Sequence, residues 1–132
     1  MRTVNVAAAI IERGREILIS QRLKDSHRGL KWEFPGGKIE HGESPEECLR
    51  REIKEELDLD IRVGERLMIV EHQYEDLKVI LYCHRCSYLG GEAKAKDCHD
   101  FRWVVAGDLT NFDFAEADRP VVRSLTAQAG SG

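Results

Sequence analysis

Three glutamates lie close together on one side of a predicted helix. The helix is expected over Ser44–Leu57, and it follows an expected glycine-containing loop, Phe34–Lys38. At about 100° per residue, Glu52, Glu55 and Glu56 fall within a sector roughly 100° wide. Like charges three or four residues apart on a helix repel each other by roughly 0.2–0.5 kcal/mol per pair. The cluster is therefore costly unless a positive charge binds to it.

Glu56 is the most unusual of the three, because it falls between Leu49 and Ile53, beside the apolar stripe of the helix. A carboxylate in that position is partly removed from water, which costs free energy when it has no partner. A hard cation would relieve both the repulsion and the desolvation, since Mg²⁺ takes oxygen ligands from carboxylates and from substrate phosphates. The helix therefore predicts a site for a divalent cation and a phosphorylated substrate.

The start of this helix is well marked. Ser44 is expected as the N-cap, Pro45 as the first helical residue and Glu47 as the second member of a capping box. These signals set where the glutamates lie relative to the glycine segment.

The other elements are mainly strands. A run rich in Val, Ala and Ile near the N-terminus predicts a buried strand, and Asp118-Arg119-Pro120 predicts the start of a final helix that ends near Ala129. The expected strands are Val4–Glu12, Glu16–Arg22, Ile61–Tyr74, Leu77–Tyr88 and Phe101–Val105, with a short apolar stretch at Trp32–Phe34 and a loop over Leu23–Lys31. The pattern predicts an α+β fold, with a curved mixed β-sheet sandwiched between α-helices. The length predicts one domain over residues 1–132, with a frayed tail at 129–132.

The net charge of -4 provides no basic field for a nucleic acid polymer. The longest apolar run, Val6–Ile11, is too short to span a bilayer, and the N-terminal residues have no signal-peptide pattern. A cytoplasmic protein without a membrane partner is therefore expected. Cys83 and Cys86 have the C-x-x-C spacing, but on a strand they point to opposite faces, so ordinary thiols are expected.

The spacing around the helix matches a known pattern. Gly37 is followed by five residues, Glu43, seven residues, and then the run from Arg51 to Leu59. This resembles the Nudix box of the Nudix hydrolases, G-x5-E-x7-R-E-U-x-E-E-x-G-U, in which U is aliphatic. Every defined position matches except Asp58, which stands where the family has glycine. The helix is expected to end there in left-handed backbone geometry, which Asp adopts more readily than most other non-glycine residues.

The resemblance extends beyond the box to the MutT type of Nudix hydrolase, which hydrolyses oxidised nucleoside triphosphates. It is carried by Gln21-Arg22, Lys31–Lys38, Trp103 and Ala117–Val121. It implies a Nudix fold and a requirement for Mg²⁺, with Mn²⁺ as the alternative ion.

The resemblance also implies a catalytic metal site. Its ligands would be Glu52, Glu55, Glu56 and the backbone carbonyl of Gly37, with Arg51 orienting one of the helix carboxylates.

The resemblance further implies an acidic residue on the loop six positions before the tryptophan, Trp103. That position is Asp97, which is one methylene shorter than the usual Glu. Asp100 or His99 are the alternatives for this catalytic and metal-binding role.

Five residues are candidates for binding the substrate. Arg22 and Lys38 are candidates for the phosphates, because a guanidinium binds phosphate bidentately and an ammonium supplies charge. His27 and Phe34 are candidates beside the loop, with ordinary loop and core roles as alternatives. Asp118 replaces the Asn that reads the purine in MutT-like enzymes, and it accepts hydrogen bonds but donates only when protonated. Its alternative role is a helix cap.

The activity that the resemblance implies is Mg-dependent hydrolysis of nucleoside triphosphates such as 8-oxo-dGTP to the monophosphate and pyrophosphate, in sanitation of the nucleotide pool. The alternative substrate is CTP or an oxidised pyrimidine triphosphate, because an acidic side chain can accept from the exocyclic amine of cytosine. A nucleotide-sensing or partner-binding module on the same fold is the non-enzymatic alternative. The chain is expected as a monomer or homodimer.

Overall fold

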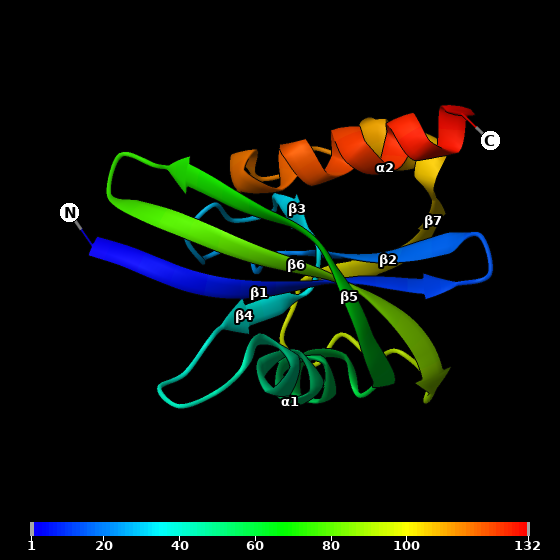
Figure 1. Ribbon diagram of the computed structural model, residues 1–132, viewed down its shortest axis with the longest axis horizontal. Coiled ribbons are helices and arrows are strands. Elements are labelled where there is room, and N and C mark those ends of the chain that lie inside the picture. Colours follow the sequence, from blue (N-terminus) through cyan, green and yellow to red (C-terminus); the bar gives the residue numbers. More distant parts are fainter. Residues whose placement is uncertain (1, 132) are drawn as a thin grey trace.

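A seven-stranded mixed sheet runs through the middle of the protein (Figure 1), in a computed structural model that describes residues 2–131. The strands are β1 (Arg2–Arg13), β2 (Glu16–Gln21), β3 (Trp32–Glu33), β4 (Gly36–Lys38), β5 (Asp60–Gln73), β6 (Leu77–Gly90) and β7 (Asp100–Val105). The helices are α1 (Pro45–Leu57) and α2 (Arg119–Ser131), with short 3-10 helices η1 (Ala106–Asn111) and η2 (Glu116–Asp118). Helices α1 and α2 lie on opposite sides of the sheet (Figure 1). The predicted α+β fold is confirmed.

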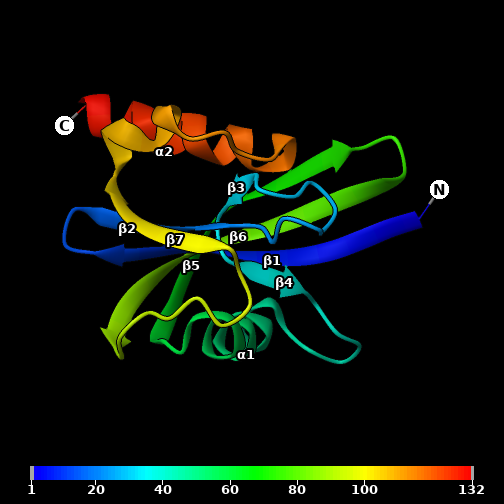
Figure 2. The same ribbon diagram turned by 180° about the vertical axis from the view of Figure 1, so that it is seen from behind.

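The strand order is β3-β2-β1-β6-β5, with β4 paired to β1 and β7 paired to β2. The long strands β1 and β6 are parallel, whereas β5 and β6 form an antiparallel hairpin. Figure 2 shows the opposite side, where β7 lies along β2. The central position of β1 brings the glycine strand β4 beside the middle of the sheet.

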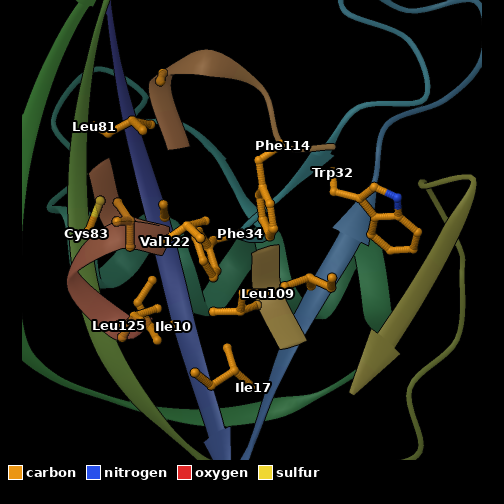
Figure 3. Close-up of a cluster of buried hydrophobic side chains, with 14 of the residues drawn as sticks. Ile10, Ile17, Trp32, Phe34, Leu81, Cys83, Leu109, Phe114, Val122 and Leu125 are labelled. Atoms are coloured by element: carbon orange, nitrogen blue, oxygen red, sulfur yellow. The ribbon is translucent and has the colours of Figure 1, made fainter. Parts of the chain in front are cut away.

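Strand β1 is apolar without alternation because both of its faces are covered. Ala8 and Ile10 pack in the cluster beneath α2, whereas Ala7, Ala9 and Ile11 pack against α1. Strands buried on both faces characteristically have continuous apolar runs. Figure 3 shows the first of these clusters, in which side chains of β1 and β2 meet Val122 and Leu125 of α2.

The two cysteines of the C-x-x-C spacing lie in different clusters. Cys83 is buried beneath α2, and Cys86 is buried on the α1 side. The prediction that the two side chains point to opposite faces of the strand is confirmed.

Helix α1 begins and ends as predicted. The Ser44 side chain accepts the N–H of Glu47, and the Glu47 carboxylate accepts the N–H of Ser44, which completes the capping box. Asp58 adopts the left-handed conformation, with φ 57° and ψ 39°, and its N–H donates to the carbonyl of Lys54. The departure from glycine therefore preserves the geometry that ends the helix.

Three features differ from the sequence expectations. Gly36–Lys38 forms strand β4, although it was expected as a glycine loop. The helices η1 and η2 were not predicted. Helix α2 runs to Ser131, two residues beyond its expected end near Ala129, and Gly132 lies outside the described residues. Among the described residues, no helix is long and apolar enough to cross a membrane.

Candidate active site

A cleft of about 750 Å³ extends from α1 to the β5–β6 hairpin. Gly37, Glu52 and Glu56 line it on the side of α1, and this part is called the carboxylate end. Tyr74 and Asp118 line it near the hairpin, and this part is called the hairpin end. The cleft is thus bordered by acidic groups at one end and by an aromatic and a buried polar group at the other.

Arg51 fixes two carboxylates by charge-assisted hydrogen bonds. Its guanidinium donates to Glu52 Oε1 at 2.6 Å and to both carboxylate oxygens of Glu43, at 2.8 and 3.0 Å. The hydrogen bond from Arg51 lowers the pKa of Glu43 to about 2. Arg51 itself does not line the cleft, so its contacts orient Glu52 from behind.

Gly37 lies directly against Glu52. A Cβ atom at this position would collide with the carboxylate of Glu52. The carbonyls of Gly37 and Lys38 each accept from the buried Cys48 thiol at 3.4 Å. The absence of a side chain at Gly37 thus lets the backbone of β4 approach the glutamates of α1.

Glu56 has a buried carboxylate oxygen that lacks a partner. Among the buried side-chain oxygen and nitrogen atoms of residues 2–131, Oε2 of Glu56 is the one that has no hydrogen-bond partner. Burial first, and then the charges of Glu33, Glu52 and Asp97, together raise the pKa of Glu56 to about 9. An unpaired buried carboxylate is costly. Oxygen donors around such a group suit a hard divalent cation.

Two of the predicted ligands lie outside the wall of the cleft. Glu55 has a side chain that is 61% exposed and lies 3.4 Å from Arg51. Asp97 is exposed, but its charge contributes to the raised pKa of Glu56. The structure thus brings Gly37, Glu52 and Glu56 together and leaves Glu55 and Asp97 at the edge.

The alternatives to Asp97 have other partners. The Asp100 carboxylate accepts the N–H of Phe101 at 2.8 Å and pairs with Arg102 at 3.1 Å, so it stabilises the start of β7. The backbone N–H of His99 donates to the carbonyl of Gln21. These contacts favour Asp97 as the loop group.

We expect Asp97→Asn to lower kcat while leaving the thermal stability of the metal-free protein nearly unchanged. Asp100→Asn should do the reverse, lowering stability with little effect on kcat, because the single amide oxygen of Asn cannot accept from both the N–H of Phe101 and the guanidinium of Arg102. Turnover and melting temperature measured for both variants check this difference. A greater loss of turnover in Asp100→Asn would contradict the assignment of Asp97.

Glu33 is a site residue to which the sequence assigned no role. It lines the cleft, is paired with Arg22 at 2.9 Å, and has its pKa raised by burial, which the charge of Arg22 partly offsets. The sequence signal was its place between Trp32 and Phe34, which both pack beneath α2. On a strand, the residue between two core residues points to the opposite side.

Arg22 is largely engaged within the protein. Its Nε donates to the carbonyl of His27 at 2.7 Å, and its NH1 donates to Glu33. His27 lines the cleft and pairs with Asp76 at 2.7 Å. Lys38 also lines the cleft and is exposed, and its ammonium forms no ion pair among residues 2–131. Lys38 is therefore the freer of the two predicted phosphate-binding cations.

Phe34 and Asp118 are joined at the hairpin end. The ring of Phe34 is 3% exposed and stacks on Phe114 with the ring centroids 5.2 Å apart, so the ring belongs to the core. The backbone N–H of Phe34 donates to Oδ1 of Asp118 at 3.1 Å. The Asp118 side chain therefore bonds to the connection between β3 and β4, and this bond does not cap the first turn of α2. Burial, with the charge of Glu33, raises the pKa of Asp118 to about 8.

Comparisons with known proteins agree with this arrangement. The family profile described as "NUDIX domain" matches residues 6–124. The chain is 34% identical over 129 residues to the CTP pyrophosphohydrolase of Escherichia coli, covering 96% of this chain and 94% of that protein. It is 32% identical over 126 residues to the 8-oxo-dGTP diphosphatase of Escherichia coli, covering 95% of this chain and 98% of that protein.

The fold is also similar to solved structures. The solution structure of the E. coli ORF135 protein matches with a TM-score of 0.81 and 31% identity, covering 99% of this chain and 94% of that one. Sequence and fold similarity therefore extend over nearly the whole chain, including both ends of the cleft.

Proposed function

The chain belongs to the Nudix hydrolase family, and on this premise we propose that it hydrolyses nucleoside triphosphates to the monophosphate and pyrophosphate. The observation that carries the proposal is the unpaired buried oxygen of Glu56, beside Glu52 and Gly37 in a cleft of about 750 Å³. A cleft of this size suits a small ligand, and its acidic end suits a cation that binds the phosphates.

Nudix hydrolases generally use a divalent metal, and we propose Mg²⁺ for this chain, with Mn²⁺ as an alternative. The residues that would hold it are Glu52, Glu55, Glu56, Asp97 and the backbone carbonyl of Gly37. When bound, the cation would neutralise the polyphosphate oxygens and so lower the barrier to attack.

The remaining chemistry falls to the side chains of the cleft. Arg51 engages Oε1 of Glu52, which leaves Oε2 free to take a proton from an attacking water. Lys38, exposed at the rim, would bind a phosphate oxygen. Arg22 would hold Glu33 in place. Phosphoryl chemistry depends mainly on such positioning and charge stabilisation.

The leading substrates are oxidised purine nucleotides such as 8-oxo-dGTP, which would give the enzyme a role in sanitation of the nucleotide pool. CTP or an oxidised pyrimidine triphosphate is the second candidate. It is favoured by the carboxylates of Asp118 and Glu33, which both line the cleft, since acidic groups accept from the exocyclic amine of cytosine. Similarity to a CTP pyrophosphohydrolase supports the same candidate.

A nucleotide panel with and without Mg²⁺ tests the proposal. We expect pyrophosphate release that requires the cation and is fastest with 8-oxo-dGTP or CTP. Release with Mn²⁺ in place of Mg²⁺ would establish the alternative ion. Tight nucleotide binding without pyrophosphate release from any member of the panel would overturn the proposal in favour of the sensing module.

Three further assignments complete the proposal. We treat residues 1–132 as one domain, since the predicted elements all join one sheet or pack on it. We propose a cytoplasmic location, where nucleoside triphosphates are consumed. The oligomeric state stays a prediction of monomer or homodimer, which light scattering would decide.

A further inference from the structure

Tyr74 connects the β5–β6 hairpin to the segment that carries Asp118. Its hydroxyl oxygen accepts the backbone N–H of Ala117 at 2.9 Å. Ala117 directly precedes Asp118 in η2, and both residues are buried. In Figures 1 and 2 the start of α2 lies beside the end of β5 that leads to this hairpin. Tyr74 therefore helps to set where the buried carboxylate lies.

The Asp118 segment is fixed by contacts to the β3–β4 region and to the β5–β6 hairpin. The N–H of Ala115 donates to the carbonyl of Trp32, and Asp118 itself accepts the N–H of Phe34. Two contacts come from the hairpin, namely the bond from the Ala117 N–H to Tyr74 and the pair formed by His72 of β5 and Glu116 of η2, 3.1 Å apart. A buried backbone N–H needs a partner, so removal of the tyrosine hydroxyl would leave the Ala117 N–H unsatisfied and loosen the segment next to Asp118.

Tyr74 is itself held on two sides. The guanidinium of Arg28 lies over its ring, with Cζ 3.3 Å from the ring centroid, and His72 contacts it edge-on at 4.5 Å between centroids. Asp76 fixes Arg28 through one carboxylate oxygen at 3.1 Å and binds His27 through the other at 2.7 Å. These contacts hold the loop that follows β2 against the hairpin.

Arg28 also has an unusual backbone conformation. Its φ of 56° lies in the left-handed region, which a non-glycine residue adopts at a cost. Such conformations persist where surrounding contacts hold them, and they are found most often at functional sites. The contacts with Tyr74 and Asp76 supply that hold at the rim of the cleft.

We propose that Tyr74 is a positioning residue that determines substrate specificity, because it holds Asp118 at the hairpin end while Arg28 and Asp76 hold Tyr74. The inference rests on the proposed function, since it requires a nucleotide base at that end of the cleft. Tyr74 lies at the opposite end from Glu52 and Glu56. Its effect should therefore fall on KM and on the choice of base, with little change in kcat.

Tyr74→Phe tests this proposal, because it keeps the ring and removes the acceptor. We expect the ratio of kcat/KM between 8-oxo-dGTP and CTP to change by about fivefold or more, mainly through KM, since unpaired polar groups in a site penalise one base over another. Tyr88→Phe is the matched control. It also removes a hydroxyl that bonds to backbone, at the carbonyl of Gly91, but Tyr88 does not line the cleft.

Arg28→Gln supplies a second test of the same connection. It should change the substrate ratio in the same direction and by less than Tyr74→Phe. The double variant should then show no larger change than Tyr74→Phe alone, because residues that act through one contact are not additive. A fully additive double variant would overturn the role given to Arg28.

Amide hydrogen exchange separates this inference from the proposed function. Exchange at Ala117 should rise by about tenfold in Tyr74→Phe and stay unchanged in Tyr88→Phe, and the measurement needs no substrate. The specificity role is overturned if the ratio of kcat/KM between 8-oxo-dGTP and CTP in Tyr74→Phe stays within about twofold of wild type. It is also overturned if Tyr74→Phe loses kcat/KM equally with both nucleotides and has a lower melting temperature. A wild-type protein that releases no pyrophosphate refutes the proposed function, whereas slow exchange at Ala117 in Tyr74→Phe refutes the positioning of Asp118 alone.

Discussion

Glu56→Gln and Glu52→Gln are each expected to reduce turnover by roughly a thousandfold or more while the fold stays intact. Loss of a metal ligand raises the barrier by several kcal/mol, and each 1.36 kcal/mol corresponds to about tenfold in rate. The structural reason is that Glu52 lies against Gly37 and is oriented by Arg51, while Glu56 has an unpaired buried oxygen. Steady-state kinetics at saturating Mg²⁺ measure the effect.

Glu46→Gln is the matched control for both variants. Glu46 is an exposed residue in the first turn of the same helix and lies outside the cleft. The turnover of Glu46→Gln should therefore stay close to that of wild type. Circular dichroism of all three variants checks that the fold is kept. If Glu56→Gln or Glu52→Gln turns over within about threefold of wild type, the metal assignment is wrong.

The metal-free protein provides a second readout for Glu56. Burial, ahead of the charge of Glu33, raises the pKa of Glu56 to about 9 from its ordinary value of 4.5. The folded state therefore keeps a proton that the unfolded state loses, so stability is fully present below about pH 4.5 and falls as the pH rises towards 9. Glu56→Gln should remove this fall and gain on the order of a few kcal/mol near pH 8. Urea unfolding of wild type and Glu56→Gln at several pH values measures this difference. If Glu56 does not cause the loss of stability, the free energy of unfolding will change with pH in the same way in both proteins.

Local sequence signals were sufficient for helix α1. Its N-cap, its capping box and its end at Asp58 each depend on a few neighbouring residues, and all three agree with the structure. The position of Glu56 beside the apolar stripe also follows from helical periodicity alone. The desolvation of Glu56 was therefore foreseeable before any tertiary contact was known.

Long-range pairing explains what the sequence did not reveal. Strand β4 consists of Gly36, Gly37 and Lys38, which have no strand-like pattern, and its pairing partner β1 lies about thirty residues earlier in the chain. Glu33 and Arg22 are separated by a loop whose path sequence patterns do not define. Similarly, the contact between Tyr74 and Ala117 joins residues 43 positions apart.

For Arg22, the residue type and the observed contacts lead to different conclusions about phosphate binding. Its guanidinium suits phosphate chemically, but its Nε and NH1 donate to His27 and Glu33. The chemistry of a side chain indicates what it can bind, whereas its existing partners decide whether it is available. Lys38, which has the same charge and no ion pair among residues 2–131, is therefore the stronger candidate for a direct phosphate contact.

Asp118→Asn is expected to lower kcat/KM for CTP relative to 8-oxo-dGTP by roughly five- to a hundredfold. The Asn oxygen can keep the bond from the Phe34 N–H, which leaves an amide NH₂ where Asp118 has Oδ2. An NH₂ group donates to a purine carbonyl but leaves the exocyclic amine of cytosine without an acceptor. A polar group left unpaired in a site costs about 1–3 kcal/mol, and each 1.36 kcal/mol is about tenfold.

The pH provides an independent check on the same residue. Burial raises the pKa of Asp118 to about 8, so the free carboxylate that accepts from cytosine is formed as the pH rises past that value. The preference of wild type for CTP should therefore increase from about pH 7 to pH 9, and Asp118→Asn should lose this increase. Asp108→Asn, at an exposed position outside the cleft, is the control. If Asp118 served only as a helix cap, Asn would replace it almost equally well, and both the substrate ratio and its pH dependence would stay the same.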